Sequence, residues 1–403
     1  MVTSTRTTTR SQPGKAEAAA ATTAPPPPPP VKIETKKLSL FGYLDMIPGL
    51  AAIVATAVAS LITGLFRSEQ DSKTYHLHVA NTTLRKATHR LNPLQLQLVS
   101  PNTDIIYNQY ARARNFKPDT VALAHGAQGH WVGNKNATNV FIWYHVRLEK
   151  GDCMSGADFR LSGGGFCLPA NIGYFKFFER LLKEINAAGG DLCVFAVTYT
   201  LAPHGRYPVQ LTQSVEALRH VLEHTGRSPG NLVLGGDSAG GNLVFGVLSH
   251  LAHPHPSIAP LHVSKPLAGA AAIAPWVSLH PDLSEQVIYD GGDIVTTFVG
   301  ESWSREFMGD AKPDYYTDAF DAPSSWFETF PVDKMLMLGG ENEILMPMIE
   351  LFYETVKAGH ANVELFKGKR ESHVAPIYNI YVGDNTETEQ GKKLKTWLIE
   401  LLK

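Results

Sequence analysis

The stretch NLVLGGDSAGGNLVFGVLSHL, residues 231–251, constrains the fold of this chain more than any other. An apolar run enters a turn with glycines on both sides of one serine, and an apolar run with helical spacing follows directly. In such a strand–turn–helix unit the serine lies on a sharp bend, and glycines two positions before and after it leave room for the neighbouring strand and helix. The GxSxG motif of residues 236–240 therefore makes Ser238 a candidate nucleophile.

From about residue 139 onwards, short β-branched or apolar runs alternate with longer stretches of helical spacing. This alternation is typical of βαβ units, which build a parallel sheet. We therefore predict an α/β fold with a mostly parallel central sheet flanked by helices. The predicted strands are 140–145, 193–200, 232–236, 269–275, 335–338 and 363–366, and the predicted helices include 174–189, 210–226, 349–359 and about 391–402.

Ser238 requires two partners, because a serine hydroxyl at its ordinary pKa is a weak nucleophile. A histidine base and a carboxylate that orients it should both follow the serine in the chain. His373 follows the last predicted strand, and Glu341 and Glu343 follow the strand before it. Since the carboxyl ends of strands in α/β sheets collect catalytic groups, we predict His373 as the base and Glu343 as the acid, with Glu341 as the alternative acid.

Four segments give the chain a specific family resemblance: VTYTLAPHGRYPVQLTQSVEAL, GGDSAGGNL, APWVSL, and GGENEIL followed by SHVAP. Together they resemble the hormone-sensitive-lipase-like branch of the α/β-hydrolase superfamily, most of all its steryl acetyl hydrolase and arylacetamide deacetylase group. The resemblance covers residues 139–403 and implies an α/β-hydrolase fold with a helical cap. It also implies hydrolysis of carboxylic esters without a metal or organic cofactor, with Ser238, Glu343 and His373 as the triad. The glutamate departs from the aspartate that is more frequent in the family.

The resemblance further implies an oxyanion hole, formed by a His-Gly-Gly-Gly turn after the third strand of the fold. Its donors here would be the backbone N–H groups of Gly164 and Gly165, opposite the N–H group of Ala239. Each donor of this kind contributes about 10²–10³-fold to the rate. The sequence has the glycines, but Ser162 stands where the family has its histidine, and His145 lies seventeen residues before Ser162.

Residues 146–162 are interpreted as extra residues, because without them YH would join GGGF and restore the family turn. One explanation is a genuine surface insertion, which is tolerated because loop length costs little entropy. The other explanation is an error in the gene model, such as a retained intron.

The domain organisation is predicted from changes in composition along the chain. Residues 1–37 are rich in Thr, Ala and Pro and are expected to be a disordered tail, with an organelle transit peptide as the alternative. Residues 38–67 are expected to form an apolar helix. Residues 68–118 are expected to contribute to the cap of a hydrolase domain at 119–403, together with a segment at about 280–330.

From Ile47 to Phe66 the chain is uncharged over 20 residues, about the length that crosses the hydrocarbon core of a bilayer. Two interpretations stay open: a spanning anchor, and a helix that packs on the cap or lies in one leaflet. For an anchor, the lysines before this segment favour a cytoplasmic N-terminus and a catalytic domain in the lumen of the endoplasmic reticulum. Sequons at Asn81 and Asn136 would then allow glycosylation. A cytoplasmic or peripheral membrane location is the alternative.

Charge and cysteine content argue against several other functions. With 36 basic and 38 acidic residues the net charge is -2, which gives no general attraction to nucleic acid or to anionic lipid. Three cysteines in no metal-binding pattern indicate neither a disulfide framework nor a metal site. The expected partner is a small apolar ester with a short acyl group, such as a sterol or secondary-metabolite acetate. A non-catalytic binding protein with this fold and a serine peptidase are the alternatives.

Overall fold

The computed structural model describes Met1 and residues 33–147, 164–280 and 292–403. In these residues the strands form one eight-stranded sheet in the order β1-β2-β4-β3-β5-β6-β7-β8. Pairing is antiparallel from β1 to β4 and parallel across the rest of the sheet, which confirms the predicted α/β fold. The strands are β1 (Thr120–Ala122), β2 (Gln128–Val132), β3 (Asn139–Arg147), β4 (Leu192–Thr200), β5 (Leu232–Asp237), β6 (Leu267–Ile273), β7 (Val332–Gly340) and β8 (Val363–Gly368).

The predicted strands coincide with β3 to β8, and each end agrees within three residues. β1 and β2 were not predicted. Both are short, and β2 pairs antiparallel with β4, whose residues lie more than sixty positions later in the chain. Their strand conformation therefore depends on tertiary pairing more than on local sequence.

Helices cover both faces of the sheet. On one face α5 (Ile172–Ala187) and α11 (Glu389–Leu401) contact each other, and α10 (Ala375–Tyr381) packs on α5. On the other face lie α6 (Val209–His224), α7 (Ala239–Ala252) and α9 (Met346–Gly359). α7 and α9 are in contact there through the rings of Phe245 and Phe352. The helices predicted from apolar spacing are thereby confirmed.

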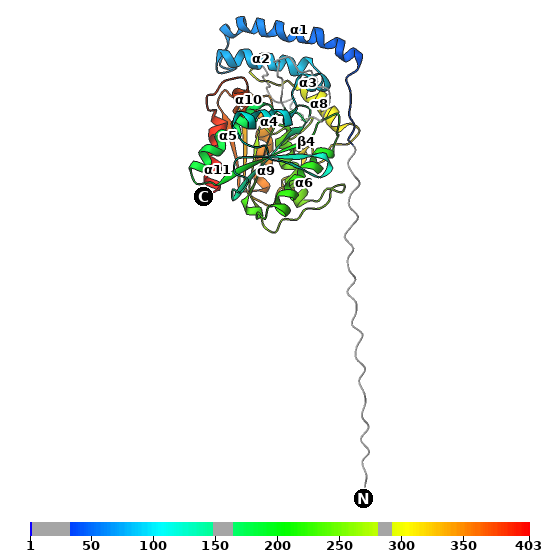
Figure 1. Cartoon of the computed structure of the whole chain (residues 1–403), viewed down its shortest axis with the longest axis vertical. Coiled ribbons are helices and arrows are strands. Elements are labelled where there is room, and N and C mark those ends of the chain that lie inside the picture. Colours follow the sequence, from blue (N-terminus) through cyan, green and yellow to red (C-terminus); the bar gives the residue numbers. More distant parts are fainter. Residues whose placement is uncertain (2–32, 148–163, 281–291) are drawn as a thin grey trace.

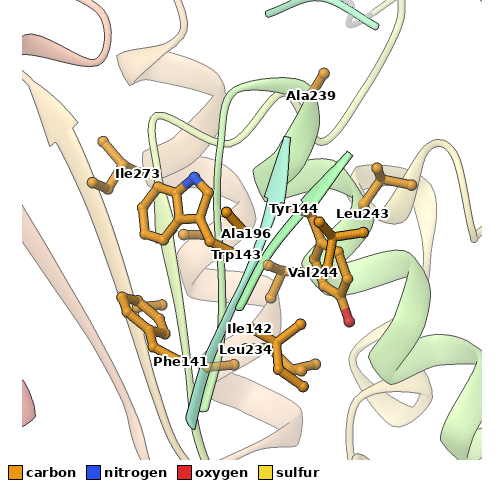
Figure 2. Close-up of a cluster of buried hydrophobic side chains, with 14 of the residues drawn as sticks. Phe141, Ile142, Trp143, Tyr144, Ala196, Leu234, Ala239, Leu243, Val244 and Ile273 are labelled. Carbon is orange, nitrogen blue, oxygen red and sulfur yellow. The ribbon is translucent and has the colours of Figure 1, made fainter. Parts of the chain in front are cut away.

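The central strand β3 is buried on both faces. Phe141 and Trp143 point to one side of the sheet, while Ile142 and Tyr144 point to the other, towards Val244 of α7 (Figure 2). The four β3 side chains are completely buried. Double-sided burial explains why this strand is a continuous apolar run without polar alternation.

A second layer of helices covers the carboxyl ends of the strands, and Figure 1 shows α1 lying lengthwise on α2 at one extremity of the molecule. This layer contains α1 (Leu40–Thr63) with the short helix η1 (Gly64–Phe66), α2 (Tyr75–Arg90), α3 (Pro93–Val99), α4 (Thr103–Ala113) and α8 (Thr297–Met308). α3 is tied to the loops beneath it, because Gln97 Nε2 donates 2.8 Å bonds to the carbonyl oxygens of Cys167 and of Ala202, which follows β4. The domain boundaries proposed from composition stay predictions.

Three predicted features fall partly or wholly outside the described residues. They are the tail, the extra residues 146–162 and the first part of the cap segment at 280–330. Within the described part, β3 continues through His145 to Arg147 and stays paired with β4, so two of the extra residues extend a strand. Cys153 also lies outside the described residues.

The two sequons differ in accessibility. Asn81 lies on α2 and is 4% exposed, and its amide donates to Ser72 Oγ at 3.0 Å and to Ser372 Oγ at 3.3 Å. Asn136 is exposed. The folded structure therefore has room for a glycan on Asn136, whereas one on Asn81 would not fit.

Candidate active site

Ser238 lies at the bend between β5 and α7. Its backbone has φ 52° and ψ -116°, a strained conformation for a residue with a side chain. Two backbone bonds hold it there: the Ser238 N–H group donates to the Ile273 carbonyl at 2.9 Å, and its carbonyl accepts from the Trp276 N–H group at 3.1 Å. The neighbouring strand β6 and the loop after it therefore fix the position of the serine.

The glycines of the GxSxG motif are required by close backbone contacts. A Cβ atom on Gly236 would lie 2.3 Å from the Gly240 carbonyl oxygen, and one on Gly240 would lie 2.2 Å from the Tyr144 carbonyl oxygen. Neither contact can be relieved by a flexible side chain. The motif therefore packs the bend tightly between α7 and β3.

Asp237, directly before the serine, is buried behind the bend. Its carboxylate accepts from Tyr174 Oη at 2.5 Å and from Trp143 Nε1 at 3.1 Å. Burial raises the pKa of Asp237 to about 6, although both bonds oppose the rise. Asp237 therefore anchors the bend to α5 and β3, a role that the motif alone did not reveal.

His373 and Glu343 meet as a buried pair beside this bend. His373 Nδ1 and Glu343 Oε1 are 3.3 Å apart, and the side chains are 5% and 0% exposed. The other carboxylate oxygen of Glu343 accepts the Gly340 N–H group at 2.6 Å. Glu341 is exposed, and its carboxylate accepts from the Arg370 N–H group instead. Of the two acids left open by the sequence, Glu343 is the one that contacts the histidine.

Three carboxylates set the protonation of His373. Burial alone would lower the pKa of His373, but the hydrogen bond and charge of Glu343, and the charges of Asp293 and Asp237, raise it above its usual value of 6.5. A raised pKa means that the surroundings stabilise the imidazolium form. This is the form that a general base adopts after it has taken a proton.

Asp293 joins the two loops that carry this pair, and sequence analysis missed it. Its side chain is fully buried. One carboxylate oxygen accepts the N–H group of His373 at 2.9 Å, and the other accepts the N–H group of Ile344, also at 2.9 Å. Burial is the main cause that raises the pKa of Asp293 to about 6. Ile344 directly follows Glu343, so one carboxylate holds the backbones of both loops.

The residue after the histidine is strained. Val374 has φ 52° and ψ 36°, in the left-handed region that β-branched residues rarely enter. Backbone strain of this kind persists only where the surroundings enforce it, and it is concentrated at functional sites. Ser238 and Val374, on two different loops, are both in this class.

The glycines predicted for the oxyanion hole lie beside the serine. A Cβ atom on Gly164 would lie 3.4 Å from Ser238 Oγ. Gly165 has φ 60°, and a Cβ atom there would lie 1.8 Å from the indole of Trp303 in α8. Ala239 is buried and begins α7, directly after Ser238. The described end of the glycine turn therefore approaches the nucleophile, while its beginning lies outside the described residues.

Ser238, His373 and both glycines open onto one cavity of about 60 Å³. Leu84 and Thr88 of α2 form part of its wall, and α8 contributes Val299 and Trp303. Most of the lining is apolar. The remaining lining residues are Leu168, Asp237, Trp276, Ile294, Val295, Thr296, Gly300, Ile344, Leu345, Val374 and Tyr378.

In the part of the chain that the structure describes, the His, Cys, Asp and Glu side chains form no group that could hold a metal ion. Cys167 and Cys193 are free and buried, and burial raises the pKa of both thiols.

Proteins of known structure share this fold. Carboxyl esterase 2 from the mycorrhizal fungus Tuber melanosporum superposes with a TM-score of 0.54 at 19% identity, over 71% of this chain and 84% of that one. An esterase from the bacterial hormone-sensitive lipase family gives a TM-score of 0.52 at 20% identity, over 82% of this chain and 98% of that one. At such low identity these similarities concern the fold alone.

Curated relatives match shorter segments. Arylacetamide deacetylase of Bos taurus is 37% identical over 125 residues, which is 30% of this chain and 31% of the relative. Steryl acetyl hydrolase 1 of Saccharomyces cerevisiae is 30% identical over 116 residues, which is 29% of this chain and 25% of the relative. The matched segments thus span about a third or less of the length of these relatives.

The family assignment comes from a longer match. A family model described as the α/β hydrolase fold matches residues 159–377, which is more than half of the chain. The range includes the serine bend, both glycines and the buried His373–Glu343 pair. This agrees with the resemblance seen in the sequence motifs and with the observed sheet. The chain therefore belongs to the α/β-hydrolase family.

Proposed function

We propose that this chain is a serine hydrolase that cleaves carboxylic esters, with Ser238 as nucleophile, His373 as base and Glu343 as acid. One observation carries the proposal: a strained serine and the histidine of a buried histidine–carboxylate pair open onto the same apolar cavity. A serine in this setting is activated when the histidine removes its proton.

Each of these residues has a role in one or more steps of the proposed reaction. Ser238 Oγ attacks the ester carbonyl carbon as its proton passes to His373, and Glu343 holds the imidazole in the required tautomer. The negative oxygen of the tetrahedral intermediate accepts hydrogen bonds from the backbone N–H groups of Gly164, Gly165 and Ala239. His373 then protonates the leaving alcohol. Water hydrolyses the acyl-enzyme by the same steps.

The cavity favours an apolar ester with a short acyl group. A single water molecule needs about 10–15 Å³ of cavity volume. A cavity of about 60 Å³ therefore accommodates a few heavy atoms beside the serine. The side chains of Leu84, Val299 and Trp303 offer no charge to a substrate. The acetyl group of such an ester fits this volume, whereas a bulky apolar alcohol, such as a sterol or a secondary metabolite, would extend beyond it. The names of the relatives that act on acetyl groups agree with a short acyl group.

Membrane association through residues 40–66 is part of the proposal. In the described residues this is the one helix long and apolar enough to cross a bilayer, although a signal sequence would pass the same test. Location in the endoplasmic reticulum with a lumenal catalytic domain stays a prediction, with a cytoplasmic or peripheral location as the alternative.

Turnover of a series of p-nitrophenyl esters tests the proposed activity. We expect the acetate to be cleaved faster than esters with long acyl chains, and a fluorophosphonate probe to label Ser238. Absence of both turnover and labelling would indicate a non-catalytic binding protein. Cleavage of peptides in preference to esters would indicate a peptidase.

A further inference from the structure

The placement of α1 is unusual for a helix with the length of a membrane anchor. Together with η1 it forms an apolar stretch of 27 residues, about 40 Å long. It does not project away from the protein but lies along α2, with which it makes extensive contact (Figure 1). The orientation of this helix relative to a membrane is therefore constrained by α2 and α3 beneath it, which are called the cap from here on.

The inner face of α1 is shaped for this packing. The buried positions Gly42, Met46, Gly49, Ile53 and Ser60 recur every three, four or seven residues and form one stripe. A Cβ atom on Gly49 would lie 2.8 Å from Leu91 Cδ2. The small residues therefore bring the helix backbone close to the cap.

Polar bonds fasten the N-terminal half of α1. Arg90 at the end of α2 pairs with Asp45 through two N–O contacts, of 2.9 and 2.7 Å. Gln95 of α3 donates to the Gly42 carbonyl at 2.9 Å and to the same carboxylate at 3.0 Å. The bonds to Arg90 and Gln95 lower the pKa of Asp45 to about 2.

The C-terminal half of α1 is fastened in the same way to the start of α2. Tyr75 Oη donates to the Leu61 carbonyl at 2.8 Å, and Thr63 Oγ1 lies 3.2 Å from His78 Nε2. A helix that left the cap to span a bilayer would lose the bonds at both ends. It would also carry Asp45 towards the membrane without Arg90, which is costly for a charge.

The outer face of α1 and η1 is apolar, and none of the residues that the structure describes covers it. Most of the exposed large apolar side chains of the described residues lie here, between 44% and 82% exposed. No charged residue occurs between Asp45 and Arg67. An apolar face of this extent marks an interaction site. Its members are Leu40, Phe41, Tyr43, Leu44, Ile47, Val54, Val58, Leu61, Ile62, Leu65 and Phe66.

The ends of the face indicate which partner covers it. Lys37 precedes the helix and Arg67 follows it, and both are exposed. Phe41 and Tyr43 lie near the first end, and Phe66 lies at the second. Basic and aromatic residues around an apolar helical face match the headgroup region of a leaflet that contains anionic lipid.

We propose that α1 lies in the plane of a membrane, with its outer face in one leaflet and its inner face fixed to the cap. α2, directly beneath α1, supplies Leu84 and Thr88 to the wall of the catalytic cavity. The layer that faces the lipid is thus adjacent to the cavity, and an apolar ester dissolved in the leaflet has a short route to it. This route, unlike the orientation of α1, rests on the proposed function.

Depth measurements on the full chain in phosphatidylcholine–phosphatidylserine vesicles test the orientation. Single fluorophores are attached at Ile47→Cys, Val54→Cys, Val58→Cys and Leu65→Cys in a Cys153→Ser background, and brominated lipids quench them. An in-plane helix places all four positions at the same shallow depth. Central positions deep in the bilayer with shallow ends would show a spanning helix, and absence of quenching would show that no lipid covers this face; either result overturns the proposal.

Vesicle flotation tests the surface separately from catalysis. The double variant Val54→Glu/Val58→Glu should lower the bound fraction roughly tenfold, because it places two charges in the leaflet. Leu351→Glu introduces charge at an exposed residue of α9 and should bind like the natural chain. Equal binding by all three proteins contradicts the proposal. Hydrolysis of p-nitrophenyl acetate in solution should stay unchanged in the double variant, so a failure of the proposed activity would be recognised independently.

Discussion

The serine bend and the α1 layer, which is helix α1 where it packs on α2 and α3, are held in place by different means. Around Ser238 the geometry comes from the backbone, through glycines whose Cβ atoms would clash and through bonds between adjacent strands. The α1 layer is held by an apolar stripe and a few side-chain bonds such as Asp45–Arg90. We infer that the bend tolerates almost no substitution, whereas the α1 layer can lose single contacts without loss of the active site.

The largest effect is expected at the nucleophile. Ser238→Ala should lower kcat for p-nitrophenyl acetate by at least about 10⁴-fold, because no other group can form the acyl-enzyme. Thermal unfolding should show a folded variant, since only one oxygen atom is removed. Residual turnover near that of the natural chain would exclude Ser238 as the nucleophile.

Glu343→Gln should be nearly as severe. A glutamine preserves the shape but cannot hold the histidine in the required tautomer or balance its charge, so kcat should fall about 10³–10⁴-fold. Glu341→Gln is the matched control and should keep full activity, because Glu341 is exposed and does not contact His373. The reverse order of effects would transfer the acid role to Glu341.

Gly165→Ala should reduce kcat about 10²–10³-fold, comparable to the loss of one oxyanion donor. The added Cβ atom collides with Trp303 and also occupies a positive-φ position. Gly189→Ala separates the two causes, since Gly189 has φ 90° but no atom within 4 Å of an added Cβ atom. The control should be less stable but fully active, whereas equal activity of both variants would disprove a role of this turn.

A smaller effect is expected for Asp293→Asn, together with a change in pH dependence. His373 must be neutral to act as base, so kcat/KM of the natural chain should rise with pH through a pKa above 6.5. The carboxylates of Glu343, Asp293 and Asp237 all raise the pKa of His373, and Asp293→Asn removes the charge of one of them. The acid limb should therefore shift to lower pH, with a loss of about tenfold at the maximum. A decrease without any shift would indicate a structural role only.

The smallest effect on catalysis is expected for Arg90→Ala. It removes the charged partner of Asp45, which keeps its bond from Gln95, and loosens the N-terminal half of α1. Hydrolysis of a soluble ester should change less than about twofold, because isolated ion pairs near the surface contribute little to stability. Limited proteolysis between α1 and α2 should nevertheless become faster. A large loss of activity would show that the cavity depends on the α1 layer.

Sequence was sufficient where function depends on local backbone geometry. The GxSxG motif identified the bend, and runs of apolar residues identified β3 to β8, because both signals are contained in a few consecutive residues. The sequence left Glu341 and Glu343 as alternatives, because it does not show which of two acidic side chains on one loop points towards the histidine. The fold separates them: one is exposed and the other is buried against His373.

Other features required the tertiary structure. Asp293 lies 51 and 80 residues before the N–H groups that it binds, so no spacing could have linked it to them. Apolar composition could not decide whether α1 spans a membrane or packs on the cap, because hydropathy is the same in both cases. In the structure, the close approach of Gly49 to Leu91 and the bonds from Arg90 and Gln95 show that α1 packs on α2 and α3.

The position of Asp293 has a consequence for protein engineering. Cap regions are an obvious target for changing substrate preference, and a cap exchange guided by composition would replace this residue together with the segment at 280–330. Asp293, however, accepts hydrogen bonds from the backbones of the two loops that carry Glu343 and His373, so it is part of the catalytic loops and not of the cap. A chimaera should therefore keep residue 293 from the parent chain and join the foreign cap only after it.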